Sequence, residues 1–190
     1  MGRLVCLLGG ACVGKDTVRS IILEKHSSKF VSAISHTTRP IRATEKGNEY
    51  YFIDDAEFLA MYENGEFLET RTYSIANGDI WYYGYSIDEI NSCLAKKDVL
   101  MIVDLQGFKE FKAIYGDQCI GIYIAVSRDI RIKRYLERDE LTWENVTEAV
   151  RRILDDDERA FNGYEKWVDK IIYTNESDFT VKEVERFLGL

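Results

Sequence analysis

The segment GGACVGKDT, residues 9–17, most constrains how this chain can fold. It follows a short apolar run at 3–8 that predicts a buried strand, and it precedes a stretch at 15–25 with helical spacing of apolar residues. Glycines in such a turn let backbone N–H groups point inward around an anion, and the helix N-terminus adds positive potential. The spacing G-x4-G-K therefore predicts a phosphate-binding loop, with a lysine that reaches the bound phosphates. We assign to this loop the residues Gly9, Gly10, Ala11, Cys12, Val13, Gly14, Lys15, Asp16 and Thr17.

Asp16 departs from the usual form of this loop, in which a hydroxyl residue follows the lysine. Thr17 offers a hydroxyl one position later. The helix dipole favours a carboxylate in the first turn, but that carboxylate repels phosphates unless a cation stands between them. Because Mg²⁺ prefers oxygen ligands, we interpret Asp16 and Thr17 as candidate magnesium ligands. The alternative is that Asp16 is merely tolerated.

Beyond the loop, short apolar runs alternate with helical patterns. Strands are predicted at 30–34, 99–104, 120–126 and 170–173, and helices at 87–97, 108–115, 129–138, 143–165 and 181–188. This alternation predicts a parallel sheet covered on both faces, with ligands bound beyond the carboxyl ends of the strands. Between residues 50 and 85 the sequence pattern changes, and we interpret this part as an inserted lobe. There, aromatic β-prone stretches at 50–53, 67–73 and 81–83 surround a short helix at 55–63.

The composition argues against several classes of protein. A formal net charge of −8 over 190 residues argues against a broad nucleic-acid-binding surface. No apolar run approaches the roughly 20 residues of a membrane span, and the N-terminal apolar run is too short for a signal peptide. The four cysteines show no C-x-x-C pairing and the chain has two histidines. We therefore expect no zinc site, reduced thiols and a cytoplasmic location.

A second cluster of candidate ligands lies in SHTTRPIRATEKGNEYYFI, residues 35–53. Arg39 and Arg42 stand three apart, with Ser35 before them and Tyr50 after them. A guanidinium group binds phosphate through paired N–H donors, so two arginines and two hydroxyls suit a phosphate monoester. The alternative is a solvated basic loop.

Six motifs in order resemble the guanylate kinase family, whose members transfer a phosphoryl group from ATP to GMP. They are the phosphate loop, SHTTRPIR, G-x-x-YYF, GEFLE, YYG and VDLQG, and they span residues 5–107. The resemblance implies a P-loop three-layer α/β core with a parallel sheet, an inserted β-rich lobe that binds the nucleoside monophosphate, and a helical lid. It divides a single domain into a core at 1–34, 87–126 and 167–190, a GMP-binding lobe at 35–86 and a lid region at 127–166.

The resemblance also implies roles for individual residues. Glu69 matches the carboxylate that accepts hydrogen bonds from guanine N1–H and N2–H₂, and Asp104 matches a second acid near the base. The implied GMP-binding set is Ser35, Arg39, Arg42, Tyr50, Glu69, Tyr83 and Asp104. In the family, lid arginines close over the ATP phosphates. Here Arg134 and Arg138 match the pair before the lid turn, and Arg151 or Arg152 matches the one after it. Together with Lys15 they form the implied catalytic set.

The implied activity is ATP-dependent phosphorylation of GMP, and of dGMP, by in-line transfer with Mg²⁺, which would make the chain a transferase of purine nucleotide metabolism. Three positions depart from the family pattern. Asp16 stands in the loop, Ile102 stands where the family strand reads D-x-D, and Tyr85 stands where a small hydroxyl residue helps to recognise guanine O6. Ser86 is a candidate to take over that last role. We interpret Asp16 as the source of the negative charge that Ile102 cannot supply.

Two other functions fit the same sequence. The first is phosphorylation of another (deoxy)nucleoside monophosphate, since some phage kinases of that type also read G-K-D-T. The second is a non-catalytic guanylate-kinase-like module that binds proteins. Such modules tend to lose the loop lysine and the lid arginines, whereas Lys15 and the arginines are present here.

Overall fold

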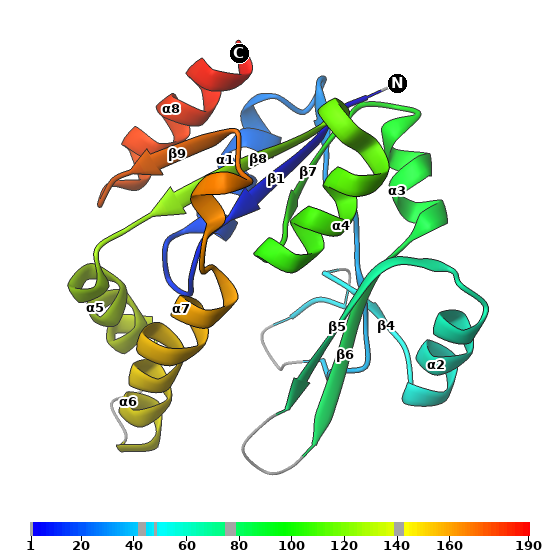
Figure 1. The fold of residues 1–190 in the computed structure, drawn as a ribbon, viewed down its shortest axis with the longest axis horizontal. Coiled ribbons are helices and arrows are strands. Elements are labelled where there is room, and N and C mark those ends of the chain that lie inside the picture. The colour runs from blue at the N-terminus through cyan, green and yellow to red at the C-terminus, as the bar shows by residue number, and fades with distance from the viewer. Residues whose placement is uncertain (1, 42–44, 48, 75–78, 139–142) are drawn as a thin grey trace.

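The computed structural model describes residues 2–41, 45–47, 49–74, 79–138 and 143–190, which fold around two sheets (Figure 1). The larger sheet is parallel and has the strand order β2-β7-β1-β8-β9. Its strands are β1 (Leu4–Leu8), β2 (Phe30–Val31), β7 (Asp98–Ile102), β8 (Cys119–Ala125) and β9 (Lys170–Tyr173). Because β1 is the middle strand, the loop that follows it opens at the centre of the carboxyl edge of the sheet.

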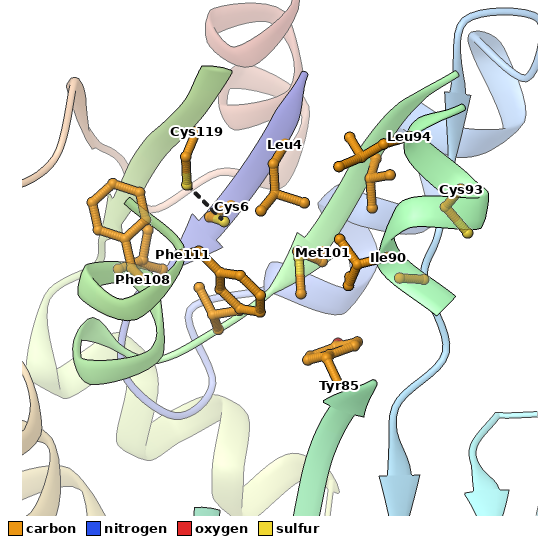
Figure 2. Packing of buried hydrophobic residues seen from close by; sticks show 14 of the residues in the cluster. Leu4, Cys6, Tyr85, Ile90, Cys93, Leu94, Met101, Phe108, Phe111 and Cys119 are labelled. Carbon is orange, nitrogen blue, oxygen red and sulfur yellow. Dashed lines mark hydrogen bonds between the residues drawn. The ribbon is translucent and has the colours of Figure 1, made fainter. Parts of the chain in front are cut away.

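The side chains of β1 alternate between two cores and so define three layers. Leu4, Cys6 and Leu8 pack with α3 (Ile87–Leu94) and α4 (Leu105–Tyr115). Val5 and Leu7 pack on the opposite face with α1 (Lys15–Lys25) and α8 (Ser177–Leu188). Figure 2 shows the first core, in which aromatic rings of α4 lie against the sheet. Every residue of β1 is buried, as expected for a strand covered on both faces. The predicted three-layer α/β core is therefore confirmed.

The smaller sheet forms a lobe that is inserted between β2 and α3 in the chain. Its order is β4-β3-β6-β5, built from β3 (His36–Thr37), β4 (Tyr51–Phe52), β5 (Phe67–Ser74) and β6 (Ile80–Ser86), with α2 (Asp55–Glu63) between β4 and β5 in the chain. The antiparallel register of β5 and β6 sets Glu69 opposite Tyr85 and Arg71 opposite Tyr83. These four side chains therefore share one face of the lobe. On the other face, Phe58 of α2 stacks on aromatic rings of both strands, with centroids 4.6 and 5.3 Å apart.

A helical segment follows β8. It contains α5 (Arg128–Arg138), α6 (Trp143–Val150), a π-helix (Arg151–Asp156) and α7 (Asp157–Ala160). Short 3-10 turns lie at Gly116–Gln118 and Tyr164–Lys166. Figure 1 shows the segment and the lobe on the same side of the parallel sheet, beyond the carboxyl ends of its strands. Ligands bind on that side in open α/β sheets. In the described part of the chain, no helix is long and apolar enough to cross a membrane.

The strand predicted at 30–34 is shorter than expected. It ends at Val31, because the Ile34 N–H donates to the Glu89 carboxylate at 2.9 Å instead of joining the ladder with β7. The chain then leaves the core and enters the lobe.

The helix predicted at 143–165 is also interrupted. It becomes π-helical at Arg151–Asp156 and ends at Ala160. Gly163, with a left-handed φ of 75°, then turns the chain so that Tyr164 stacks on Tyr123 of β8, with ring centroids 3.6 Å apart. The other predicted elements are present, with ends shifted by a few residues.

Candidate nucleotide-binding site

The predicted phosphate loop follows β1 and ends in α1. Gly9 (φ 143°), Cys12 (φ 60°) and Gly14 (φ 95°) have positive φ angles, which turn the backbone tightly between the strand and the helix. A side chain at Gly9 is excluded as well, since its Cβ would lie 2.6 Å from a carbonyl oxygen of β8. Lys15 Nζ donates to the carbonyl oxygens of Gly9 (2.6 Å) and Gly10 (2.8 Å). The ammonium group is thereby held at the loop, where it supplies positive charge.

Two arginines of α5 donate hydrogen bonds to the backbone of the loop. Arg134 donates to two loop carbonyl oxygens, each at 3.2 Å. Arg131 Nε donates to Ala11 O at 2.8 Å, and its guanidinium pairs with the Asp157 carboxylate. The same carboxylate accepts from the Ala11 N–H at 2.9 Å. Backbone N–H groups of such loops bind phosphate oxygens. The Asp157 carboxylate therefore accepts a hydrogen bond from an N–H group that would otherwise be available to a phosphate.

Only part of the predicted arginine set lies at the loop in the described residues. Arg134 does, whereas Arg151 is exposed in the π-helix, and the side chains of Arg138 and Arg152 lie outside the described residues. Arg131 was not among the arginines predicted for the loop, although it lies one helical turn before Arg134 and so on the same face. No motif or spacing in the sequence predicted that its partner Asp157 would lie at the loop.

Asp16 projects from the first turn of α1 toward solvent. Its side chain is 83% exposed and pairs with Arg19, one turn along the helix, at 3.2 Å. Thr17 is also exposed. The described residues contain no group of three or more side chains that could hold a metal by themselves. Mg²⁺ is usually bound by one or two carboxylates together with water and substrate phosphates, so an exposed carboxylate beside an exposed hydroxyl fits it.

A basic and aromatic cluster occupies the predicted monophosphate site of the lobe. Arg39 is only 4% exposed and forms an ion pair with Glu45, with N–O distances of 2.6 and 3.0 Å. The guanidinium lies over the ring of Tyr50, 5.2 Å from its centroid, and Tyr50 packs edge-to-face on Tyr83 at 5.9 Å. The partnership with Glu45 was not predicted.

Charges at the start of α1 also act on this cluster. Burial is the main cause that raises the pKa of Tyr50, and the charges of Asp16 and Arg19 on α1 also act on it. Ser35, another predicted ligand, is buried where the chain enters the lobe. Arg42 lies outside the described residues.

The predicted base site contains an arginine that the sequence reasoning missed. Glu69 is 6% exposed, and burial raises the pKa of its carboxyl to about 7. Asp104 follows β7 and caps α4 by accepting from the Gly107 N–H at 2.9 Å. Arg71 lies between them, with Nη2 3.0 Å from Glu69 Oε2 and Nε 2.9 Å from Asp104 Oδ2. Strand alternation could have found Arg71, which stands two residues after Glu69.

Tyr85 and Ser86, which follow the YYG motif, both contact parts of the core. Tyr85 is buried in the core and packs edge-to-face on Phe111, with ring centroids 6.2 Å apart (Figure 2). Burial raises its pKa, so the hydroxyl keeps its proton. Ser86 accepts from the Glu89 N–H at 3.3 Å and caps α3. Because neighbouring strand residues point to opposite faces, Ser86 lies away from Glu69. This placement argues against the suggestion that Ser86 takes over the role.

The chain matches known proteins over nearly its whole length. The family model described as Guanylate kinase matches residues 1–189. A guanylate kinase of Enterococcus faecalis (strain ATCC 700802 / V583) is 41% identical over 125 residues, which cover 65% of this chain and 57% of that protein. A guanylate kinase of Legionella pneumophila (strain Lens) is 32% identical over 154 residues, which cover 78% of this chain and 71% of that protein. The chain thus spans less than two thirds of the length of the first relative.

A solved structure has the same fold. The crystal structure of guanylate kinase from Anaplasma phagocytophilum matches with a TM-score of 0.70 and 23% sequence identity, over 98% of this chain and 84% of that one. At this identity the likeness shows the fold alone. The family model, which covers residues 1–189, shows more: the chain belongs to the guanylate kinase family.

Proposed function

We propose that this chain phosphorylates GMP, and also dGMP, with ATP as the phosphoryl donor. The observation that carries the proposal is the buried Glu69 carboxylate, which Arg71 joins to Asp104. Asp104 follows β7, and β7 pairs with the strand that leads into the phosphate loop. Guanine presents two adjacent donors, N1–H and N2–H₂, and a carboxylate presents two acceptors. The names of the relatives support the same activity.

The acceptor nucleotide would be held at both ends. Glu69 accepts from the base, while Arg39 and the hydroxyls of Ser35, Tyr50 and Tyr83 take the monophosphate. Arg39 is paired with Glu45 in this structure. The phosphate therefore has to share or replace that carboxylate as a partner of the guanidinium.

The donor nucleotide would bind at the loop. The loop N–H groups hold the phosphates, and Lys15 moves its hydrogen bonds from the two glycine carbonyls to phosphate oxygens. Arg134 keeps the loop in shape through its carbonyl contacts. Asp16 and Thr17 would hold Mg²⁺, which neutralises charge on the phosphates when bound. The transferring group moves in line between two oxygens, and no covalent enzyme intermediate or general base is required because the acceptor is already an anion.

An ADP-release assay with a panel of monophosphates tests the proposal. We expect GMP and dGMP to be turned over, and AMP, CMP and UMP to react poorly, because none of those three bases presents two adjacent donors to Glu69. Lys15→Ala should abolish turnover. If AMP reacted as fast as GMP, the base assignment would be wrong. If no monophosphate reacted while GMP still bound, the chain would be a binding module instead.

A further inference from the structure

Arg71 lies in a narrow space between Glu69 and Gly107 that admits a guanidinium group. It stands in the middle of β5, opposite Tyr83, and its side chain is only 17% exposed. A Cβ at position 107 would collide with the Arg71 guanidinium, and it would lie 3.1 Å from Glu69 Oε2. The glycine of the motif VDLQG therefore leaves room for the two charged groups side by side.

The polar atoms of this pair are close but poorly satisfied. Arg71 Nη2 lies 3.0 Å from Glu69 Oε2, and Nε lies 2.9 Å from Asp104 Oδ2. These atoms attract one another as ions, yet their orientations do not make hydrogen bonds. Within the described residues, Glu69 Oε2 and Arg71 Nε and Nη2 are buried atoms that lack a hydrogen-bond partner. Buried polar atoms are normally satisfied, so an acceptor and adjacent donors stand ready for a ligand.

A carboxylate acceptor beside a guanidinium donor is complementary to one edge of guanine. On that edge the N1–H donor is adjacent to the O6 acceptor, and N7 lies beyond it. Arginine carries donors and no acceptor, so it matches a 6-oxo group and opposes a 6-amino group. Tyr85 and Ser86 have other contacts: Tyr85 packs on Phe111 and Ser86 caps α3.

We propose that Arg71 is a specificity-determining residue that donates to O6 of the guanine base while Glu69 accepts from N1–H and N2–H₂. This inference rests on the proposed function, since it concerns the base of the same acceptor nucleotide. The competing role is electrostatic only: Arg71 would balance the charges of Glu69 and Asp104 without touching the base.

The two roles are separated by a double-mutant-type cycle in which a protein side chain and a substrate atom are each changed. Its variant is Arg71→Met, which keeps length but removes charge and donors. Its substrates are GMP and the 6-thio analogue of GMP, which keeps N1–H and N2–H₂ but carries a weak sulfur acceptor in place of O6. If Arg71 reads O6, the wild type prefers GMP over the 6-thio analogue by about 10- to 100-fold in kcat/KM, the range for one charge-assisted hydrogen bond. Arg71→Met then loses most of that preference.

A second substrate pair reports on Glu69 alone. IMP lacks the N2 amine but keeps O6, so Arg71→Met should leave the ratio of GMP to IMP unchanged. Arg3→Met is the matched control, because Arg3 is also an ion-paired arginine but stands at the amino end of β1. It should change neither ratio. Arg71→Lys, which keeps the charge without the planar fork, should be intermediate and serves if Arg71→Met does not fold.

The outcomes distinguish this inference from the proposed function. If the wild type phosphorylates GMP but Arg71→Met keeps the full preference for GMP over its 6-thio analogue, Arg71 does not read O6 and the kinase assignment stands. A uniform loss on all three substrates, with the acid limb of the pH profile moved, would assign the electrostatic role instead. If the wild type turns over no substrate, the same ratios are measured as Kd by calorimetry. Failure of GMP to bind would then overturn both proposals.

Discussion

Replacing Glu69 by glutamine should stabilise the protein at alkaline pH while removing the partner of the base. Glu69 is 6% exposed, and burial raises the pKa of its carboxyl to about 7, although the Arg71 charge works in the opposite direction. A group whose pKa is raised by folding contributes stability that is complete below its unfolded pKa. That contribution is lost as the pH rises through the folded pKa.

The magnitude follows from the two pKa values. Raising the pKa of the carboxyl from 4.5 to about 7 corresponds to about 3 kcal/mol of unfolding free energy. The loss occurs between about pH 4.5 and pH 8. Glutamine has nearly the same shape and does not ionise. The difference in unfolding free energy between Glu69→Gln and the wild type should therefore increase by about 3 kcal/mol, in favour of the variant, from pH 4.5 to pH 8.

Urea unfolding of both proteins at several pH values measures this difference by linear extrapolation. Glu63→Gln, the same exchange at an exposed position of α2, is the matched control for the substitution itself. An unchanged difference for Glu69→Gln across the range would refute the reasoning, because it would mean that the folded carboxyl titrates like the unfolded one. GMP turnover should fall in the variant, since glutamine presents one acceptor where guanine offers two donors.

The remaining predictions concern phosphate and metal. Arg39→Ala should raise KM for GMP about 10- to 100-fold and KM for ATP little, and an unchanged GMP dependence would remove Arg39 from the acceptor site. Asp157→Asn should lower KM for ATP, because its carboxylate occupies the Ala11 N–H and repels phosphate; a raised KM would show that Asp157 shapes the loop instead. Asp16→Ser should lower activity and raise the Mg²⁺ requirement, and adding Ile102→Asp should recover much of the loss. Additive effects in Mg²⁺ titrations, or a faster Asp16→Ser enzyme, would contradict the interpretation that Asp16 supplies the charge that Ile102 cannot.

The core could be predicted because its signals are local. An apolar strand of five residues, a glycine-rich turn and a helix with regular apolar spacing follow one another in β1, the loop and α1, and the alternation along β1 already divides the two cores. The helix end at Ala160 could not be found in this way. It depends on the stacking of Tyr164 against β8, which is distant in the sequence.

The long-range partners in the buried ion pairs are the part of the site that sequence reasoning could not supply. A charged residue in a predicted strand or helix is normally solvated, and only the fold reveals which opposite charge it meets. Arg131 of α5 meets Asp157 of α7, and Arg71 meets Glu69 of its own strand and Asp104 beyond the end of β7. The last case matters most for function. Arg71 lowers the pKa of Glu69, against the larger effect of burial, and so favours the ionised carboxylate that guanine needs. An arginine in this position thus helps the acceptor beside it and, on our proposal, supplies the donor that Tyr85, turned into the core, does not.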